Sequence, residues 1–446
     1  MSLERDALFP FVPTGRGAPL AISRAEGAYL YTREGQKILD AAGGAIAVSI
    51  GHGRREVAEV AARALAESGY VVPVFATEDR LQLVERLVDR WLPGELRRVF
   101  FTSGGSESVD AAMRLARQHH VSAGRSSRWK ILGRDLSYHG TTLASLAVGG
   151  HQKRRKGFDP LLLDLPKAPA CYCLRCPLGQ RYPGCRVACA DEIERVIERE
   201  GAETVAAFIA EPVGGSTAGA LVPPPEHWPR VAEICRERGV LLIMDEVMTG
   251  FGRTGKRFAV EHWGLAPDIL VSGKGLSGGY AAIGAVFATE DVMAPLAERG
   301  DELMYYTFGG HPAACAIADK VLEIMEREDL VERAAKLGER LHDALAPLER
   351  HPNVAGLRGL GLLRAVELVA DRDTLDPFPE AANLGYRVVV HGILRGVFYY
   401  PGGSDPARDI VCLGPPFIIG DEEIEKMARV LPDAIDAAVA SCPNPG

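Results

Sequence analysis

The sequence predicts an α/β fold in which a large parallel β-sheet is covered by helices on both faces. Three short apolar segments in the middle of the chain, residues 205–210, 240–244 and 269–271, are predicted to be buried strands. The segment 227–238 is predicted to be a helix, because Gly239 follows it and glycine is the residue that most often ends helices in a left-handed conformation. Buried strands that alternate with helices indicate a doubly wound, mostly parallel sheet.

The two ends of the chain are predicted to build a second, smaller domain. Residues 1–60 include a strand-like segment at 28–31, and residues 316–446 contain two long helical stretches, further strands and a last helix after Asp421. We therefore expect residues 61–315 to form the large domain. The small α+β domain is expected to combine residues 1–60 with residues 316–446.

Composition narrows the class of protein. With 47% hydrophobic and 25% charged residues, the 446-residue chain has the composition of a globular protein. Its net charge of −8 predicts neither a nucleic-acid partner nor an acidic membrane surface. Residues 1–11 lack the basic start and apolar stretch of a signal peptide, and no apolar run is long enough to span a bilayer. We expect a cytoplasmic location.

Polar residues follow four predicted strands. They are the turn Ser103-Gly104-Gly105-Ser106 after the strand at 98–101, and then Glu211, Asp245 and Lys274. In open α/β sheets, ligands bind at the carboxyl ends of the strands. These residues are therefore the candidate functional site.

The glycine-rich turn precedes a predicted helix at about 107–117. A helix N-terminus presents free backbone N–H groups and the positive end of the helix dipole, so it can bind a phosphate, with the Ser106 hydroxyl as an additional donor. The alternative interpretation is a tight turn with a serine cap.

Asp245 and Lys274 are charged residues in predicted apolar surroundings. A buried carboxylate needs a cation or several donors, so Asp245 either pairs with a protonated ring nitrogen of a cofactor or caps a local turn. Lysine is mostly a solvated surface residue. In VSGKGLSGG, however, Lys274 directly follows a strand. Desolvation there would lower its pKa and free the amine to attack a carbonyl.

Taken together, these residues resemble the class III aminotransferases, which are pyridoxal 5′-phosphate (PLP) enzymes of fold type I. The resemblance extends over essentially the whole chain. The matching strings are FFTSGGSESVDAAMRLAR (100–117), SYHG (137–140), AEPVGGSTAGALVPPP (210–225), LLIMDEVMTGFGRTG (241–255), PDILVSGKGLSGGY (267–280), YTFGGHPAAC (306–315) and PPFII (415–419).

The resemblance implies catalytic roles for several residues. Lys274 would bind PLP as a Schiff base and then move a proton between the substrate α-carbon and the cofactor. Asp245 would keep the pyridine nitrogen protonated. Tyr138 and Val247 would enclose the ring, one on each face.

The resemblance also implies the remaining contacts of the cofactor. Gly105 and Ser106 would hold its phosphate, Glu211 would lie near its hydroxyl group, and His139 would be a structural histidine beside it. Thr307 would reach the phosphate from a neighbouring subunit, which implies a homodimer.

Two departures from family patterns bear on the substrate. Thr141 and Cys412 occupy positions where the branch acting on ornithine, acetylornithine and 4-aminobutyrate has carboxylate-binding arginines. The sequence is more similar to the amine or ω-amino-acid:pyruvate transaminases, so we expect an amine or amino acid donor and a keto acid acceptor. Arg408, on a predicted mobile loop at 400–409 whose glycines would allow movement, is the candidate carboxylate-binding residue.

Two other functions remain open alternatives. The same scaffold supports racemases, epimerases, phospholyases and decarboxylases. The stretch Gly250–Gly255 matches G-x-G-x-x-G, the pattern of nucleotide-binding oxidoreductases, although Gly264 and Pro267 leave little room for the helix that this motif needs.

Five of the nine cysteines lie within residues 171–189. They could bind a structural metal, or they could be reduced cysteines that stiffen a loop. At the predicted catalytic site we expect no metal.

Overall fold

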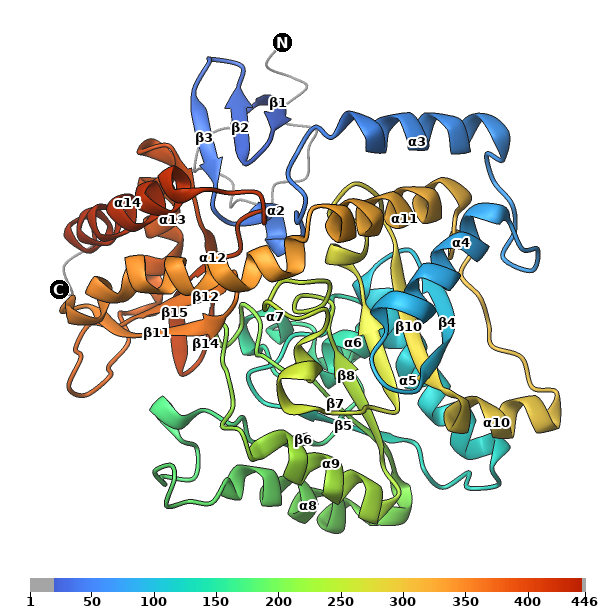
Figure 1. Cartoon of the computed structure of the whole chain (residues 1–446). Coiled ribbons are helices and arrows are strands. Elements are labelled where there is room, and N and C mark those ends of the chain that lie inside the picture. Colours follow the sequence, from blue (N-terminus) through green and yellow to red (C-terminus); the bar gives the residue numbers. More distant parts are fainter. Residues whose placement is uncertain (1–19, 443–446) are drawn as a thin grey trace.

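The computed structural model describes residues 20–442, and a seven-stranded sheet forms its centre (Figure 1). The strand order is β4-β10-β9-β8-β7-β5-β6. Only β10 runs antiparallel to its two neighbours. The strands are β4 (Leu96–Thr102), β5 (Lys130–Arg134), β6 (Lys167–Ala168), β7 (Val205–Ala210), β8 (Leu241–Asp245), β9 (Ile269–Ser272) and β10 (Gly284–Thr289).

Side chains that alternate along the strands of the central sheet pack into two separate hydrophobic clusters, one on each face. Ile209 and Ile243 belong to the cluster that contains apolar residues of α5, whereas Phe208 and Met244 belong to the cluster that contains those of α8 and α9. Since successive residues of a strand point to opposite faces, both faces of the sheet are buried. The helices of this part are α5 (Gly105–Ser122), α6 (Leu143–Val148), α7 (Gln152–Arg155), α8 (Ala188–Glu200), α9 (His227–Arg238) and α10 (Glu290–Arg299).

Two smaller four-stranded sheets lie beside the central one. The first, in the order β1-β2-β3-β13, pairs strands from both chain ends, because β13 runs parallel to β3. The second is antiparallel, in the order β11-β12-β15-β14. Their strands are β1 (Ile22–Glu26), β2 (Tyr29–Thr32), β3 (Lys37–Asp40), β11 (Val354–Leu360), β12 (Leu363–Leu368), β13 (Val397–Phe398), β14 (Tyr400–Ser404) and β15 (Ala407–Leu413).

Helices near both chain ends complete the fold. The remaining helices are α2 (Gly43–Ile46), α3 (Arg55–Glu67), α4 (Glu78–Arg86), α11 (Pro312–Arg327), α12 (Leu330–Leu345), α13 (Leu384–Leu394) and α14 (Asp421–Ala440). The predicted architecture, a large mostly parallel sheet with a small α+β part from both chain ends, is confirmed. The domain boundaries at residues 60 and 315 stay a prediction.

Local predictions match the structure closely in the central sheet. Strand β7 and helix α9 have the predicted bounds, and Gly239 ends α9 with φ 61° and ψ 34°. No helix directly follows the glycines of Gly250–Gly255; the next element is a short 3₁₀ turn at Ala259–Trp263. This geometry does not support the nucleotide-binding interpretation, which requires a helix there.

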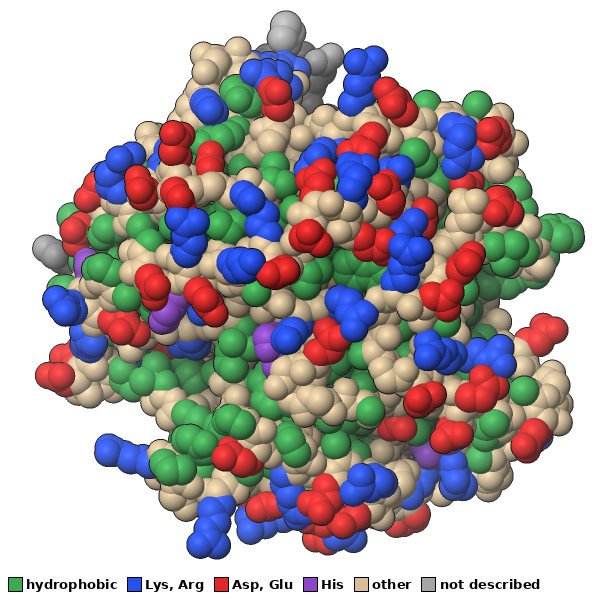
Figure 2. All heavy atoms as spheres, viewed as in Figure 1, with side chains coloured by type: hydrophobic (Ala, Val, Ile, Leu, Met, Phe, Trp, Pro, Cys, Tyr) green, Lys and Arg blue, Asp and Glu red, His purple; other side chains and the backbone are tan. Residues whose placement is uncertain are grey.

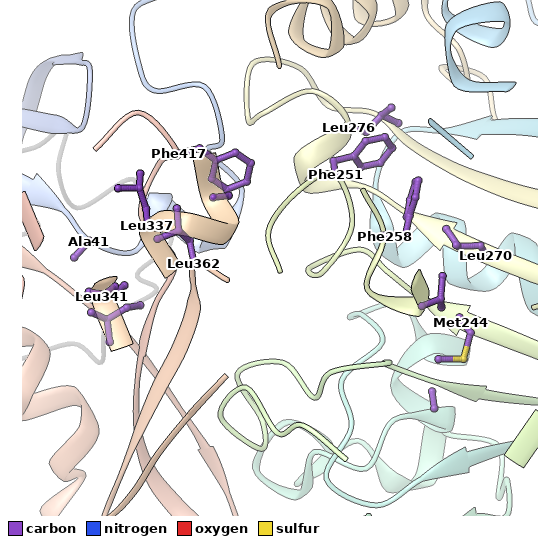
Figure 3. Packing of buried hydrophobic residues seen from close by; sticks show 14 of the residues in the cluster. Ala41, Met244, Phe251, Phe258, Leu270, Leu276, Leu337, Leu341, Leu362 and Phe417 are labelled. Atoms are coloured by element: carbon purple, nitrogen blue, oxygen red, sulfur yellow. The ribbon is translucent and has the colours of Figure 1, made fainter. Parts of the chain in front are cut away.

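Arg253, inside that glycine-rich stretch, joins the central sheet to the small part. It is buried, and its guanidinium donates to the carbonyls of Pro415 (2.6 Å) and Val48 (2.9 Å). It also lies over the ring of Phe417, 4.6 Å from the centroid. Figure 3 shows Phe417, Leu337 and Leu341 on the small-part side of the same apolar cluster that contains Phe251 and Phe258. The two parts therefore share one core. Within residues 20–442, no helix has the length and hydropathy needed to cross a membrane.

Candidate active site

A cavity of about 180 Å³ lies at the carboxyl edge of the central sheet. Three charged residues predicted for the site lie in this cavity, each at the end of a strand or just after it. Glu211 follows β7, Asp245 ends β8, and Lys274 lies just after β9. The cavity is lined by Gly105, Ser106, Tyr138, His139, Gly140, Glu211, Val213, Ser216, Asp245, Val247, Met248, Thr249 and Lys274. Eight of the ten predicted site residues are thus brought together.

Lys274 has an unusual backbone and an unusual environment. Its φ of 34° lies in the left-handed region, which is uncommon for a residue with a side chain and is often found at functional sites. Burial lowers the pKa of its amine to about 8, against the opposing effect of the Asp245 and Glu211 carboxylates. The amine is therefore partly uncharged near neutral pH and can act as a nucleophile or a base.

Asp245 is held by two donors. Its Oδ1 accepts from the backbone N–H of Val247 (3.0 Å), and its Oδ2 lies 2.7 Å from Nδ1 of His139. His139 is also buried, and its Nε2 has no hydrogen-bond partner among the described residues. The pair fixes the carboxylate in the cavity wall, where a cationic group would meet it.

Glu211 is the second buried carboxylate. Its Oε1 accepts from the backbone N–H of Gly215 (2.9 Å), its Oε2 from that of Tyr138 (3.3 Å), and the Arg134 guanidinium lies 3.6 Å away. Burial nevertheless raises the pKa of Glu211 above its ordinary value. The backbone bond to Tyr138 also fixes the start of the 138–140 turn.

The N-terminus of α5 forms another part of the cavity wall. Helix α5 is 18 residues long and begins at Gly105, so its first N–H groups have no partners within the helix. A Cβ at Gly105 would lie 2.8 Å from Val247 Cγ1, and one at Gly273 would lie 3.4 Å from Gly105 N. Glycine is required at 105 for this close approach. The Ser106 hydroxyl accepts from the backbone N–H of Thr141 (3.1 Å), which leaves its own proton for a ligand.

Two predicted site residues lie outside the cavity lining. Thr307 is exposed on the surface, and its carbonyl accepts from the Tyr70 hydroxyl (3.0 Å). Arg408 is partly exposed on β15 and forms an ion pair with Asp405.

The predicted mobile loop at 400–409 is a β-hairpin, formed by β14 and β15. Its glycines are required by close packing: a Cβ at Gly402 would lie 2.3 Å from the Ser216 carbonyl, and Gly403 N–H donates to that same oxygen (2.9 Å). The prediction of a free loop is therefore wrong. The hairpin lies against Ser216 in the cavity wall.

Sequence reasoning missed several wall residues, namely Val213, Ser216, Met248 and Thr249. Each follows Glu211 or Asp245 by two to five positions. Their position just after the ends of two strands could therefore have identified them from the sequence. The buried carboxylate of Glu246 follows Asp245 directly but does not line the cavity. Its Oε1 accepts from the Val260 N–H (2.8 Å), and its Oε2 accepts from the hydroxyl of the wall residue Thr249.

The donor set fits PLP. An anionic phosphate matches the N–H groups at the start of α5, a protonated ring nitrogen matches Asp245, and an aldehyde matches the Lys274 amine. Tyr138 and Val247 add ring and branched aliphatic surface to the same lining.

Comparisons with known proteins agree with this geometry. The model of the aminotransferase class-III family matches residues 12–435. The omega-aminotransferase of Caulobacter vibrioides is 35% identical over 434 residues, covering 95% of each chain. The putrescine–pyruvate aminotransferase of Pseudomonas aeruginosa is 32% identical over 426 residues, 94% of this chain and 91% of the other.

Solved structures extend the likeness to the fold. An (S)-enantioselective omega-transaminase from Thermomicrobium roseum is 36% identical, with a TM-score of 0.91 over 97% of this chain and 96% of that one. The omega-transaminase of Pseudomonas jessenii in complex with PMP is 31% identical, with a TM-score of 0.92 over 98% of each chain. The chain therefore belongs to the class III aminotransferases, fold type I enzymes that use pyridoxal phosphate for transamination.

Proposed function

We propose that this protein transfers an amino group from an amine or amino acid to a keto acid such as pyruvate, and that Lys274 is the residue that binds the cofactor. The observation that supports Lys274 is its buried amine, whose pKa is lowered to about 8 and which lies in one cavity with Asp245 and Glu211. When bound, PLP supplies an electron-withdrawing ring that stabilises the negative charge left by loss of a substrate proton.

The chain's own residues provide position and charge. Asp245 holds positive charge at the ring nitrogen, and His139 keeps the Asp245 carboxylate in place through its 2.7 Å contact. Tyr138 and Val247 line the same cavity and would pack against the ring. Lys274 takes and returns the proton at the substrate carbon, since its amine is close to half protonated near pH 8.

The cavity lining favours an amine donor. Lys274 is the only lysine or arginine among the described residues that line it. Cys412, buried on β15, acts electrostatically on Lys274, so an arginine in its place would have faced this site. The cavity therefore offers no fixed guanidinium to a substrate carboxylate. This supports an arginine that moves in from outside the cavity to bind the carboxylate. Arg408, on the hairpin that packs against Ser216, is our candidate.

We also propose a homodimer. Exposed apolar residues surround Thr307, and Figure 2 shows hydrophobic side chains gathered where the loop between α3 and α4 projects. Exposed apolar patches of this kind are typical of protein interfaces. Tyr70 joins the two segments, packing on the Phe308 ring at 5.9 Å and donating to the Thr307 carbonyl. The patch consists of Tyr70, Val74, Phe75, Met304, Tyr305 and Phe308.

A cytoplasmic location is part of the proposal. All nine cysteines are free thiols, which is the usage of proteins in reducing compartments.

An absorbance titration with a panel of amine donors, and pyruvate or 2-oxoglutarate as acceptor, tests the reaction and the role of Lys274 together. Lys274→Ala should remain folded and lose at least about 100-fold in turnover, since a positioned acid–base contributes 10²–10⁴. Borohydride reduction followed by peptide mapping should label Lys274. Lys256→Ala, at an exposed lysine, is the control and should behave like the parent. A label on another lysine, or racemisation without acceptor-dependent turnover, would contradict the proposal.

The same residue predicts a pH dependence. Only the uncharged amine attacks a carbonyl, so covalent PLP uptake by the cofactor-free protein should rise with pH and level off above about 8. If the lysine had an ordinary pKa, the rate of PLP uptake would keep rising up to about pH 10.4.

Asp245→Asn should still bind PLP but lose at least about 100-fold in turnover, because loss of one preorganised electrostatic partner commonly costs 10²–10³. Steady-state kinetics and the cofactor spectrum measure both effects. Asp268→Asn, at a half-buried aspartate outside the cavity, is the matched control and should keep normal turnover once folded. Near-normal activity of Asp245→Asn would show that Asp245 is not the partner of the ring nitrogen.

Arg408→Ala should raise the KM for pyruvate about ten- to hundred-fold, because charge-assisted hydrogen bonds contribute about 1.5–3 kcal/mol. The half-reaction with a simple amine donor should change little. Asp405→Asn removes the ion-pair partner of Arg408 and should leave the KM unchanged or lower it. If Arg408 only forms that surface pair, both variants will have the pyruvate KM of the parent, and Arg408 is then not the anchor.

Phe308→Asp should weaken the dimer, since it places a charge in the exposed apolar patch around Thr307. Light scattering after size exclusion should detect monomer at concentrations where the parent is dimeric, together with faster loss of PLP. Leu394→Asp, at a 70% exposed leucine on α13, is the control. A parent protein that is monomeric at all concentrations would contradict the dimer.

A further inference from the structure

Three potential metal ligands converge away from the active site. The ligand atoms of Cys171, Cys189 and His227 all lie within 4.8 Å of one another, and all three side chains are buried. Cys171 follows β6, Cys189 lies in the first turn of α8, and His227 is the first residue of α9. Three segments that are separate in the sequence thus meet at one point.

The spacing matches tetrahedral zinc. With Zn–S bonds of about 2.3 Å and Zn–N bonds of about 2.0–2.1 Å, two tetrahedral ligands lie roughly 3.5–3.8 Å apart. Sγ of Cys189 lies 3.6 Å from Nδ1 of His227. The nitrogen of the buried His227 ring that faces Cys189 is therefore Nδ1, and it would be the ligand atom.

A fourth ligand is available at the same place. Cys173, Cys176 and Cys185 line one small cavity together with Cys171 and Cys189. Cys173 lies two residues after Cys171 in the same segment. None of the nine cysteines is used in a disulfide.

We propose that Cys171, Cys189 and His227 bind a structural Zn²⁺, with Cys173 as the fourth ligand. Thiolate and imidazole are ligands that zinc prefers, and four protein ligands leave no open position for catalysis. Each bound cysteine releases one proton to solvent when the metal binds, and no electron is transferred.

The site would stabilise a segment that supports the active-site wall. Tyr172 and Arg175, next to the ligands, both bond the buried Glu367 of β12, Arg175 at 2.7 Å. Arg358 binds the same carboxylate (2.7 Å) and donates to the carbonyls of Gly219 and Ala218 (both 2.7 Å). These carbonyls belong to the loop that begins at Glu211.

A second contact leads from α9 to the same loop. Trp228, directly after the ligand His227, donates from its indole N–H to the Pro212 carbonyl (2.9 Å). The zinc site is therefore connected to both sides of the loop that carries the wall residues Val213 and Ser216.

Metal analysis of the PLP-loaded protein, expressed with added zinc and purified without chelators, tests the proposal. We expect about one zinc per chain. Cys171→Ser and His227→Ala should each reduce this below about 0.2, and Cys235→Ser, at a buried cysteine of α9 outside the cluster, should not. Replacement of zinc by Co²⁺ in the unmutated protein should give the d–d bands of tetrahedral cobalt and a sulfur-to-cobalt charge-transfer band.

Removal of the metal should also lower the Tm by about 5 °C or more, because a ligand that binds only the folded state adds its binding energy to stability. The cobalt spectrum uses the parent chain, so it keeps the proposal testable even if the variants fail to fold. Less than about 0.1 zinc per chain together with no cobalt spectrum would overturn the proposal, as would a Cys171–Cys189 disulfide found by mass spectrometry.

Discussion

Asp245 and Glu211 are buried and Lys274 is half-buried in one cavity, and each of these ionisable side chains would cost several kcal/mol if it were left without partners. The backbone and neighbouring side chains provide the compensation. N–H groups of Val247, Gly215 and Tyr138 point at the two carboxylates. The amine receives only the more distant attraction of those carboxylates, and its pKa falls to about 8. The same burial that destabilises the charged amine makes it reactive.

This arrangement requires a rigid frame. Strands β7, β8 and β9 are direct neighbours in the sheet, so the residues at their ends are spaced by the roughly 4.8 Å between adjacent strands. The cavity walls depend on more distant parts of the chain. Arg253 binds carbonyls of Val48 and Pro415, and Arg358 holds the 211–221 loop from β11. Arg253 and Arg358 thus connect the small part of the structure to segments beside the active site.

The central sheet and three of the site's charged residues were predictable from sequence because both depend on local patterns. Apolar runs identify buried strands, and polar residues at their ends identify the edge where ligands bind. Contacts between distant residues were not predictable in this way. His139 was expected only to lie beside the cofactor, and its bond to Asp245, 106 residues away, depends on the 138–140 turn. Likewise, nothing in the sequence connects His227 with Cys189, 38 residues earlier.

Glycine was the residue type on which sequence reasoning failed, for a physical reason. A glycine is compatible both with a mobile loop and with close packing of two backbones. Gly402 and Gly403 are examples of close packing, and only their tertiary contact with Ser216 shows that they do not form a mobile loop. Arg408 is therefore on a paired strand, which limits its movement to side-chain rotation and to displacement of the whole hairpin.

The cavity lining combines both signs of charge, and this determines how a ligand is oriented. The N-terminus of α5 contributes free N–H groups and a positive dipole, while Asp245 and Glu211 contribute negative charge. A molecule with an anionic group and a cationic ring nitrogen is favoured with its anionic group at α5 and its cationic nitrogen at a carboxylate, because the reverse orientation would place like charges together. Burial strengthens this discrimination, since charges interact more strongly where water is excluded.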